Sequence, residues 1–325
     1  MPKVVLTASS GQDDTITVEV YKPSQKGLWN DFIANAKNGV FLFNRDYMEY
    51  HSERFEDHSL LFYRSNRLVA VLPANLDKSV LHSHGGLTFG GIISSYKMKT
   101  HIMLSIFNKL VKHCQDLGVS EIVYKPIPYI YHSIPADEDL YALFAHNARL
   151  MARNISSCIY LPNARKFNDN RLDNIRKAKK NGITVKECTD FRSFMEIEQA
   201  NLEERHGVKP VHSVAEIELL AKRFPDNIRL FASFKDSSML AGVIMYESKN
   251  VAHMQYASNS KEGWSLGAQD IIEDYLINGY YKEKSYFDFG ISTEKLGQYL
   301  NEGLIKRKED FGASAVMYDL YHLAL

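Results

Sequence analysis

The sequence predicts an α/β (α+β) protein of two tandem domains, each with a mixed sheet flanked by helices. Three observations support this fold class. The chain has 325 residues, a length that suits about two domains. Runs of β-rich residues alternate with segments whose apolar residues recur at helical spacing. The order of elements in residues 59–125 recurs in residues 228–289, which indicates an internal duplication. We therefore expect an N-terminal domain over residues 1–160 and a C-terminal domain over residues 161–325.

The first half should form helices where apolar residues are periodic and strands at the β-rich runs. Asn44 suits the N-cap of a helix over residues 44–52. In that helix Arg45 and Tyr47 either face a substrate or pack their stems and expose their polar tips. The other expected elements are a strand at 15–20, a helix at 28–37, strands at 59–63 and 67–75, a helix at 97–117, a strand at 121–125, a helix at 137–147 and a strand at 149–161.

A glycine-rich stretch, HSHGGLTFGG, occupies residues 82–91. Its glycines permit positive φ or a close backbone approach, so it forms either a plain turn or a loop whose amides face a ligand. On a strand, His82 and His84 would face the same side and could ligate a metal. No third ligand lies nearby in the sequence, so we expect no bound metal.

The second half begins with a helix over residues 167–181 that carries a dense basic end. Its cations, among them Arg171, Arg176 and Lys177, either favour the helix macrodipole or form a phosphate-binding face. The elements expected after it are a strand at 183–187, helices at 190–205 and 213–224, strands at 229–234, 239–248 and 251–258, a helix at 267–281, a strand at 285–289, a helix at 296–310 and a last strand at 313–321.

Composition and charge exclude several classes of protein. Lys and Arg number 39, as do Asp and Glu, so no overall field attracts nucleic acid or an anionic membrane. Cys114, Cys158 and Cys188 are scattered without C-x-x-C spacing, which argues against a disulfide framework and against a zinc site. A reducing, cytoplasmic location is expected. We see no apolar run typical of a signal peptide and none near the ~18 residues of a membrane span.

Several motifs in order resemble the FemABX-like branch of the GNAT acyltransferases. They are the tandem halves, the basic helix RLDNIRKAKKNGI, the strand pair MLAGVIMYES and NVAHMQYAS, the strand end FDFG and the terminal KRKEDFG. The resemblance covers most of the chain and is strongest over residues 165–312. It implies two tandem GNAT-like domains with mostly antiparallel sheets, of the type without the long helical arm associated with tRNA binding.

The resemblance also implies an activity. Members transfer an acyl or aminoacyl group from acyl-CoA or aminoacyl-tRNA to an amine of a small molecule, an amino-sugar or a cell-wall precursor. We expect no permanently bound cofactor, and tRNA is a partner if it carries the donor. We expect catalysis in the second half, which holds more chemistry-capable residues. The family's terminal motif is FK followed two residues later by FG; here Lys308 keeps the lysine and Arg307 replaces the aromatic residue.

Amide formation requires a neutral amine, a stabilised oxyanion and a neutralised leaving group. Lys308 could neutralise an oxyanion or a donor phosphate, or be a solvated lysine of a charged helix end. Asp288 could be the general base, orient the amine, or cap a turn. Tyr256 could be an acid or a positioning hydroxyl, or a half-buried core side chain. These three residues are the catalytic candidates.

The donor is expected along the strand at 251–258 and the motif EGWSLGAQ that follows it. This motif resembles the GNAT pyrophosphate loop, although an ordinary glycine-bearing helix entry explains it equally well. The donor-binding candidates are Gln255, Gly263, Gly267 and Ala268, and the acceptor-binding candidates are Arg45, Tyr47, Arg171, Arg176 and Lys177, of which the last three could grip a diphosphate.

Two other classes of function stay open. Duplicated domains could hold a nucleotide-sugar or another ligand in a cleft without catalysing a transfer. The basic helix over residues 171–180 could bind nucleic acid, although it lacks interleaved aromatic residues.

Overall fold

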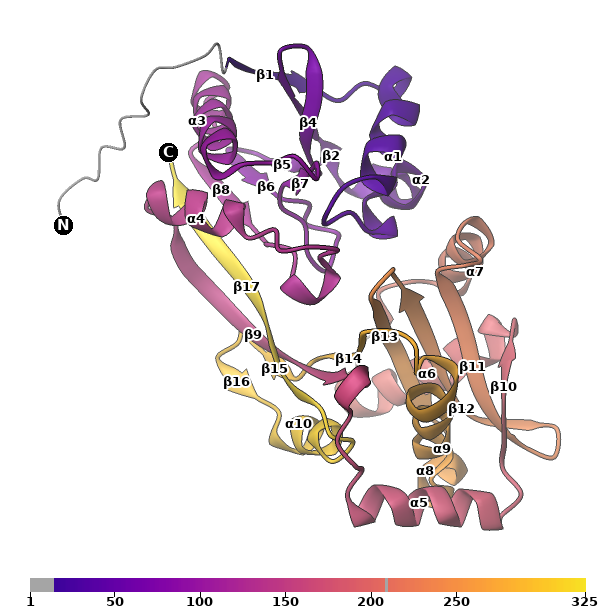
Figure 1. Ribbon diagram of the computed structural model, residues 1–325. Helices are drawn as coiled ribbons and strands as arrows, with labels where there is room; N and C mark the ends of the chain where they lie inside the picture. The colour runs from indigo at the N-terminus through magenta and orange to yellow at the C-terminus, as the bar shows by residue number, and fades with distance from the viewer. Residues whose placement is uncertain (1–14, 208–209) are drawn as a thin grey trace. The chain divides into compact units, whose positions relative to one another are not determined.

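The computed structural model describes residues 15–207 and 210–325, which form two compact units (Figure 1). The first unit contains residues 15–154, 295–298 and 317–325, and the second contains the described residues of 155–294 together with 299–316. Two long strands are divided between the units along their length. β9 (Arg149–Tyr160) begins in the first unit and ends in the second, and β17 (Ser314–Ala324) does the reverse. The predicted boundary at residue 160 is the last residue of β9, whereas the units divide within that strand, between residues 154 and 155, and each unit also takes later segments of the chain.

The first unit contains an antiparallel sheet in the order β1-β3-β4-β7 and a group of strands in the order β17-β8-β6-β5-β2. Helix α3 (Thr100–Asp116) places Ile102, Ile106 and Leu110 in a core shared with strand residues of both groups. Three shorter helices complete the unit: α1 (Lys26–Ala34), α2 (Arg45–Met48) and α4 (Glu138–Ala145). The strands are β1 (Ile16–Val20), β2 (Glu56–Asp57), β3 (Leu60–Arg64), β4 (Arg67–Leu72), β5 (Asn75–Asp77), β6 (Val80–His82), β7 (Ile93–Ser94) and β8 (Glu121–Tyr124).

The second unit is a sheet in the order β10-β11-β12-β13-β14-β9, in which the neighbours β13 and β14 are parallel and the other neighbours antiparallel. Helix α9 covers one face of β12, where Val243 and Met245 join its core. Helix α6 covers the other face, close enough that a Cβ at Gly242 would lie 2.3 Å from the Phe194 ring. The elements are α5 (Asp169–Lys180), β10 (Thr184–Cys188), α6 (Phe191–His206), α7 (Val214–Arg223), β11 (Ile228–Lys235), β12 (Ser238–Glu247), β13 (Val251–Asn259), α8 (Lys261–Leu266), α9 (Ala268–Tyr275), β14 (Tyr286–Ile291) and α10 (Glu302–Glu309).

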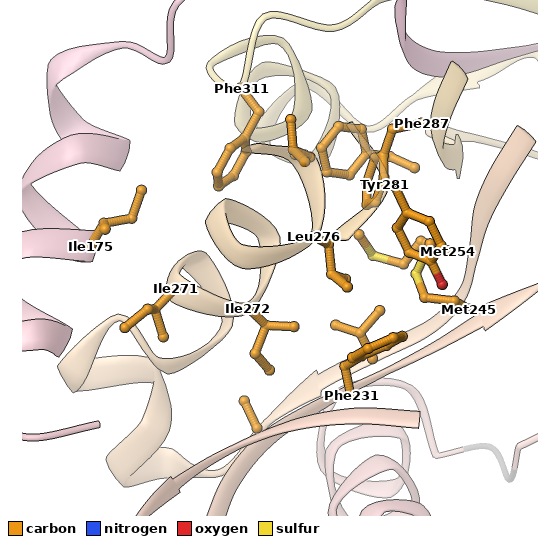
Figure 2. Close-up of a cluster of buried hydrophobic side chains, with 14 of the residues drawn as sticks. Ile175, Phe231, Met245, Met254, Ile271, Ile272, Leu276, Tyr281, Phe287 and Phe311 are labelled. Carbon is orange, nitrogen blue, oxygen red and sulfur yellow. The ribbon is translucent and has the colours of Figure 1, made fainter. Parts of the chain in front are cut away.

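The core of the second unit lies between α9 and the sheet (Figure 2). Ile272 of α9 and Leu276, just past its end, point toward Phe231 and Met245 of the strands, and Ile271 lies on the side of Ile175 of α5. All six side chains are buried, and α9 is amphipathic because Ala268, Ile271 and Ile272 recur at the i, i+3, i+4 spacing of one helix face. This packing fixes the position of α9 and therefore of Gly267, the residue that joins α8 to α9.

Three predicted helices differ from the structure. The predicted helix at 44–52 is only one turn long, α2, before a 3-10 segment (Glu49–Arg54), although Asn44 does cap it by accepting from the Asp46 N–H. The predicted helix at 267–281 is interrupted: Gly267 (φ 75°) ends α8 and begins α9, and a π-helical turn (Leu276–Tyr280) follows. The first half of the predicted helix at 296–310 is wrong, because positive φ values at residues 295–297 form a hairpin between β15 (Thr293–Glu294) and β16 (Tyr299–Leu300).

Truncation of Phe231 tests the core of the second unit. Phe231→Ala should lower the free energy of unfolding by about 3–5 kcal/mol, because it removes a fully buried ring and leaves a cavity. Phe234→Ala on the same strand is the matched control, since that ring is only half-buried and packs beside Lys186. Denaturant unfolding of both variants measures the difference. Equal losses would contradict this description of the core.

Candidate active site

The parallel strands β13 and β14 pair over a short length only. Their Cα partners are Val251 with Tyr286, Ala252 with Phe287, and His253 with Asp288. Past His253 both strands continue without further pairing to each other, so the sheet opens between them. At the same level the ladder between β13 and β12 shifts register, because Ile244 pairs with Tyr256 and Met245 with Met254. Gln255 is therefore bulged, and backbone groups of β13 that face the opening have no strand partner there.

A buried carboxylate lies where the strands part. Asp288 is fully buried and accepts three hydrogen bonds, from Ser156 Oγ (2.5 Å), His253 Nδ1 (2.9 Å) and the Gly290 N–H (3.1 Å). A carboxylate only accepts, so Nδ1 of His253 carries the proton and Nε2 of the neutral ring is left as the basic nitrogen. The His253 side chain is 12% exposed, which keeps it accessible. This pair can accept a proton from a bound group.

Lys308 holds the end of β14 from α10. Its Nζ donates to the backbone oxygens of Gly290 and Ile291, both at 2.8 Å. Burial lowers the pKa of Lys308 to about 8, and the nearby Asp288 charge opposes that shift. Gly290 thus donates its N–H to Asp288 and offers its carbonyl to Lys308, and its φ of 78° suits a glycine. Two of the three predicted catalytic residues thus meet at Gly290.

Tyr256 lies on the same face of β13 as His253. Its hydroxyl is 2.6 Å from Nδ1 of His212, a buried residue between α6 and α7. Farther along this face, Ser258 accepts a hydrogen bond from Asn201 of α6. Tyr256 is half-buried, and the contact with His212 holds its hydroxyl in place.

A pocket of about 520 Å³ lies beside the start of α9. Arg171, predicted for the acceptor, lines it together with Gly263 and Gly267, predicted for the donor. A Cβ at Gly267 would lie 2.5 Å from the Asn174 backbone oxygen, so glycine is needed for this close approach to α5. The other lining residues are Asn174, Asn259, Trp264, Gln269, Asp270, Gly303 and Arg307.

A buried ionic network forms the floor of that pocket. Asp270 accepts from Arg171 (3.1 Å), Asn174 (2.6 Å) and Arg307 (2.9 Å). Glu273 accepts from Arg307 at 2.7 Å, and burial raises the pKa of Glu273 although Arg307 opposes the shift. Arg307, which stands where the family motif has an aromatic residue, is thus an ion partner that also lies 5.4 Å from the centre of the Phe311 ring.

The structure does not bring the other predicted site residues into this pocket. Ala268 is fully buried in the core, and Gln255 is half-buried at the bulge of β13. Arg176 is exposed and paired with Asp173 at 2.5 Å, and Lys177 is exposed on α5. Neither of these two cations lines the pocket.

Two predicted acceptor residues lie in the first unit. Arg45 is buried, binds Glu49 (3.0 Å) and Asp57 (2.5 Å), and covers the ring of Tyr21. Tyr47 is also buried. Arg45 thus belongs to a buried group of ion pairs within the first unit.

No metal cluster of three or more His, Cys, Asp or Glu side chains occurs among residues 15–207 and 210–325. His84 has a φ of 61° and lies past the end of β6, which ends at His82. The two histidines therefore do not share a strand, the arrangement in which they could have ligated a metal from the same side. In the part of the chain that the structure describes, no helix combines the length and the apolar character needed to cross a bilayer.

His253 is the residue that sequence reasoning missed. Strict alternation along β13 places it on the face of Gln255 and away from Tyr256, but the bulge reverses the alternation between them. The available signal was a histidine on one expected strand and an aspartate on the next, HMQ and FDF.

The lysine pKa predicts a pH dependence of stability. The pKa of Lys308 is about 8 in the folded protein and near its ordinary value of 10.5 when unfolded, so the unfolded state binds more protons between these values. The free energy of unfolding should therefore rise with pH across that window, by on the order of 3 kcal/mol relative to Lys308→Met. Lys306→Met, an exposed neighbour, is the control. Parallel pH curves for the wild type and Lys308→Met would contradict the burial of a charged Lys308.

The ionic network predicts unequal effects along α9. Asp270→Ala should destabilise the protein by about 3–5 kcal/mol, because it leaves two buried guanidinium groups short of a partner. Asp274→Ala removes an ion pair with the exposed Lys179 and should cost about 0–1 kcal/mol. Denaturant unfolding compares the two. A small loss for Asp270→Ala would show that the network does not hold α5, α9 and α10 together.

Comparisons with known proteins agree with this architecture. Residues 165–299 match the family model of the acetyltransferase (GNAT) domain. The fold is similar to that of FemX, with 12% identity, 95% of this chain and 97% of that chain covered, and a TM-score of 0.69. It is also similar to the C-terminal domain of a putative lysylphosphatidylglycerol synthetase from Agrobacterium fabrum, with 10% identity, coverage of 92% and 91%, and a TM-score of 0.60.

A third similar structure is a tandem GNAT protein from the clavulanic acid biosynthesis pathway, with 10% identity, coverage of 95% and 98%, and a TM-score of 0.51. No curated protein sequence matches the chain. At these identities the solved structures speak for the fold, and they confirm the predicted FemABX-like arrangement of tandem GNAT-like domains. Residues 165–299 thus match the acetyltransferase (GNAT) domain, and the chain as a whole has a fold similar to that of FemX.

Proposed function

We propose that the protein transfers an acyl or aminoacyl group from an activated donor to an amine of a small molecule, an amino-sugar or a cell-wall precursor, and that the second unit catalyses the step. The observation that carries this proposal is the His253–Asp288 pair at the point where β13 and β14 part. Both residues lie within the matched GNAT domain. An amine nucleophile must lose a proton as the amide forms, and a positioned imidazole suits that task.

In the proposed step the amine nitrogen attacks the acyl carbon, and a C–N bond forms. Nε2 of His253 takes the proton that the nitrogen loses. The carbon–sulfur bond of an acyl-CoA, or the ester carbon–oxygen bond of an aminoacyl-tRNA, then breaks, and the leaving thiolate or alkoxide receives a proton. Asp288 holds the Nδ1–H of His253 throughout and stabilises the imidazolium that forms.

The geometry supports different roles for the three predicted catalytic residues. Asp288 is fully buried and already accepts three hydrogen bonds, so we assign it the positioning of His253 and not direct contact with the amine. Lys308 positions the end of β14 through two carbonyl groups. Tyr256, paired with His212 on the face of His253, is our candidate for returning a proton to the leaving group.

The oxyanion of the tetrahedral intermediate needs N–H donors. The bulge at Gln255 and the missing pairing to β14 support a role for the backbone of residues 254–256 in this task. This assignment keeps Gln255 at the donor end of the strand through its main chain.

The charges that line the 520 Å³ pocket bear on whether the donor is acyl-CoA or aminoacyl-tRNA. Arg171 and Arg307 favour a donor phosphate there, and glycine at residue 267 permits a close approach. Asp270, in the first turn of α9, opposes an anion at that helix terminus. These opposed charges do not favour acyl-CoA over aminoacyl-tRNA, so both belong in the test.

The test measures transfer of labelled acyl groups from acyl-CoA and from aminoacyl-tRNA to amino-sugars and cell-wall precursors. With the pair that the wild type uses, His253→Gln should lower kcat/KM by about 10²–10⁴-fold, because the base is lost. Asp288→Asn should also lower it and alter the pH profile, because the amide no longer holds the imidazolium. His101→Gln, an exposed histidine of α3, is the control. Full activity of His253→Gln would overturn the assignment.

A further inference from the structure

A second pocket, of about 670 Å³, lies in the first unit between the β3–β4 hairpin and the segment that leads into α3. Three cationic residues line it, Arg64, Arg67 and Lys97, and none of its lining residues in the described ranges 15–207 and 210–325 is a carboxylate. Other pockets of the described chain contain acids: Asp270 lines one, Glu187 a second and Glu56 a third. The chain as a whole carries equal numbers of acidic and basic residues, so this pocket is a local excess of positive charge.

The hairpin itself brings two of these cations together. Arg64 and Arg67 are Cα partners directly opposite each other on β3 and β4. The turn between them, Ser65 and Asn66, has positive φ at both residues (47° and 61°), as a tight two-residue hairpin requires. Opposite residues of an antiparallel pair project from the same face, and like charges there destabilise the pair. An anion bound here would be attracted by both guanidinium groups.

Lys97 is held next to the hairpin by the main chain. The Ser95 N–H donates to the Val69 backbone oxygen of β4 (3.0 Å), and the Met98 N–H donates back to Ser95 (3.0 Å). This tight turn fixes the segment against β4, and Lys97 is thereby one of the three cations around the same hollow. Both Arg67 and Lys97 are exposed, so their charges are available to a ligand.

Apart from the polar Asn35, Ser65 and Ser95, the rest of the lining carries apolar or aromatic side chains. Leu68 and Val69 of β4 and the buried Met98 and Ile102 form it, and an exposed tyrosine, Tyr96, stands at the edge. A free inorganic ion would use the cations and leave these side chains uncovered. A ligand that carries an apolar or aromatic body next to its charge would cover them as well.

We propose that this pocket binds an organic phosphate, with the phosphate between Arg64, Arg67 and Lys97 and the apolar body over Leu68, Val69 and Met98. The forked donors of arginine match phosphate oxygens, and two such forks with one ammonium group suit a doubly charged phosphomonoester. A nucleoside monophosphate and a phospholipid headgroup share this chemistry. The proposal concerns the first unit alone and does not depend on the reaction proposed for the second.

The binding experiment uses the full chain with ¹³C-methyl-labelled methionine. Three probes are titrated: inorganic phosphate, uridine monophosphate, and dihexanoyl phosphatidic acid below its micelle concentration. We expect one of the two organic phosphates to shift the Met98 methyl signal and to bind at least about tenfold more tightly than inorganic phosphate. The methyl signal of Met103, which is buried in the first turn of α3, should not shift. The preferred ester identifies the source of the phosphate, nucleotide or lipid. No Met98 shift, or equal affinity for inorganic phosphate, overturns the proposal.

Variants then test the cations. Arg67→Gln and Lys97→Gln should each weaken the preferred ester by about tenfold or more, since each removes a charged hydrogen-bond donor. Lys78→Gln, an exposed lysine of the turn between β5 and β6, is the matched control and should leave affinity unchanged. Methyl spectra without ligand confirm that each variant is folded. Unchanged affinity in both folded pocket variants would overturn the assignment.

Discussion

A fully buried carboxylate determines how the centre of the second unit is built. Asp288 has no contact with solvent, and a buried charge is tolerated only when it is bonded, because its desolvation otherwise costs several kcal/mol. Its three donors come from three strands: Ser156 from β9, His253 from β13 and Gly290 from β14 itself. The carboxylate therefore ties the register of these strands to one another. It also fixes the tautomer of His253, whose side chain is partly exposed.

The opening between β13 and β14 and the ionic network beneath the pocket are both held by α10. The bulge at Gln255 and the short β13–β14 pairing leave main-chain groups of β13 facing the gap. Behind it, Arg307 connects α10 to Asp270 and Glu273 of α9. The neighbouring Lys308 connects α10 to the end of β14. Two consecutive residues of one helix thus hold both the floor of the pocket and the rim of the opening.

Much of this fold was predictable because its longer elements are strongly periodic. The apolar face of α3 and the β-rich runs of β11, β12 and β13 fixed their positions to within a few residues. Failures occurred where one residue changes the local geometry. Gly267 interrupts an otherwise continuous helical pattern, and the turn at residues 295–297 replaces a predicted helix.

The site was less predictable than the fold, for a physical reason. Asp288 and Lys308 were identified from motifs, but their partners depend on contacts between distant positions. Ser156 lies 132 residues from Asp288, and nothing in its local sequence distinguishes it from a neighbouring serine. His253 was hidden by a single bulge that changes which side chains share a face. Arg307 stood out in the sequence only as a replacement for the aromatic residue of the family motif, and the structure reveals its acidic partners.

The division of β9 and β17 between the units has a consequence for dissecting the protein. A fragment that starts at residue 161 would lack the strand with which β14 pairs, together with the Ser156 hydroxyl. A fragment that ends at residue 160 would lack the end of β17, which pairs with β8 and contributes Leu323 to the first core. Each piece would expose an unpaired sheet edge, the kind of surface that promotes aggregation. A stable fragment of either half would therefore need a replacement strand at that edge.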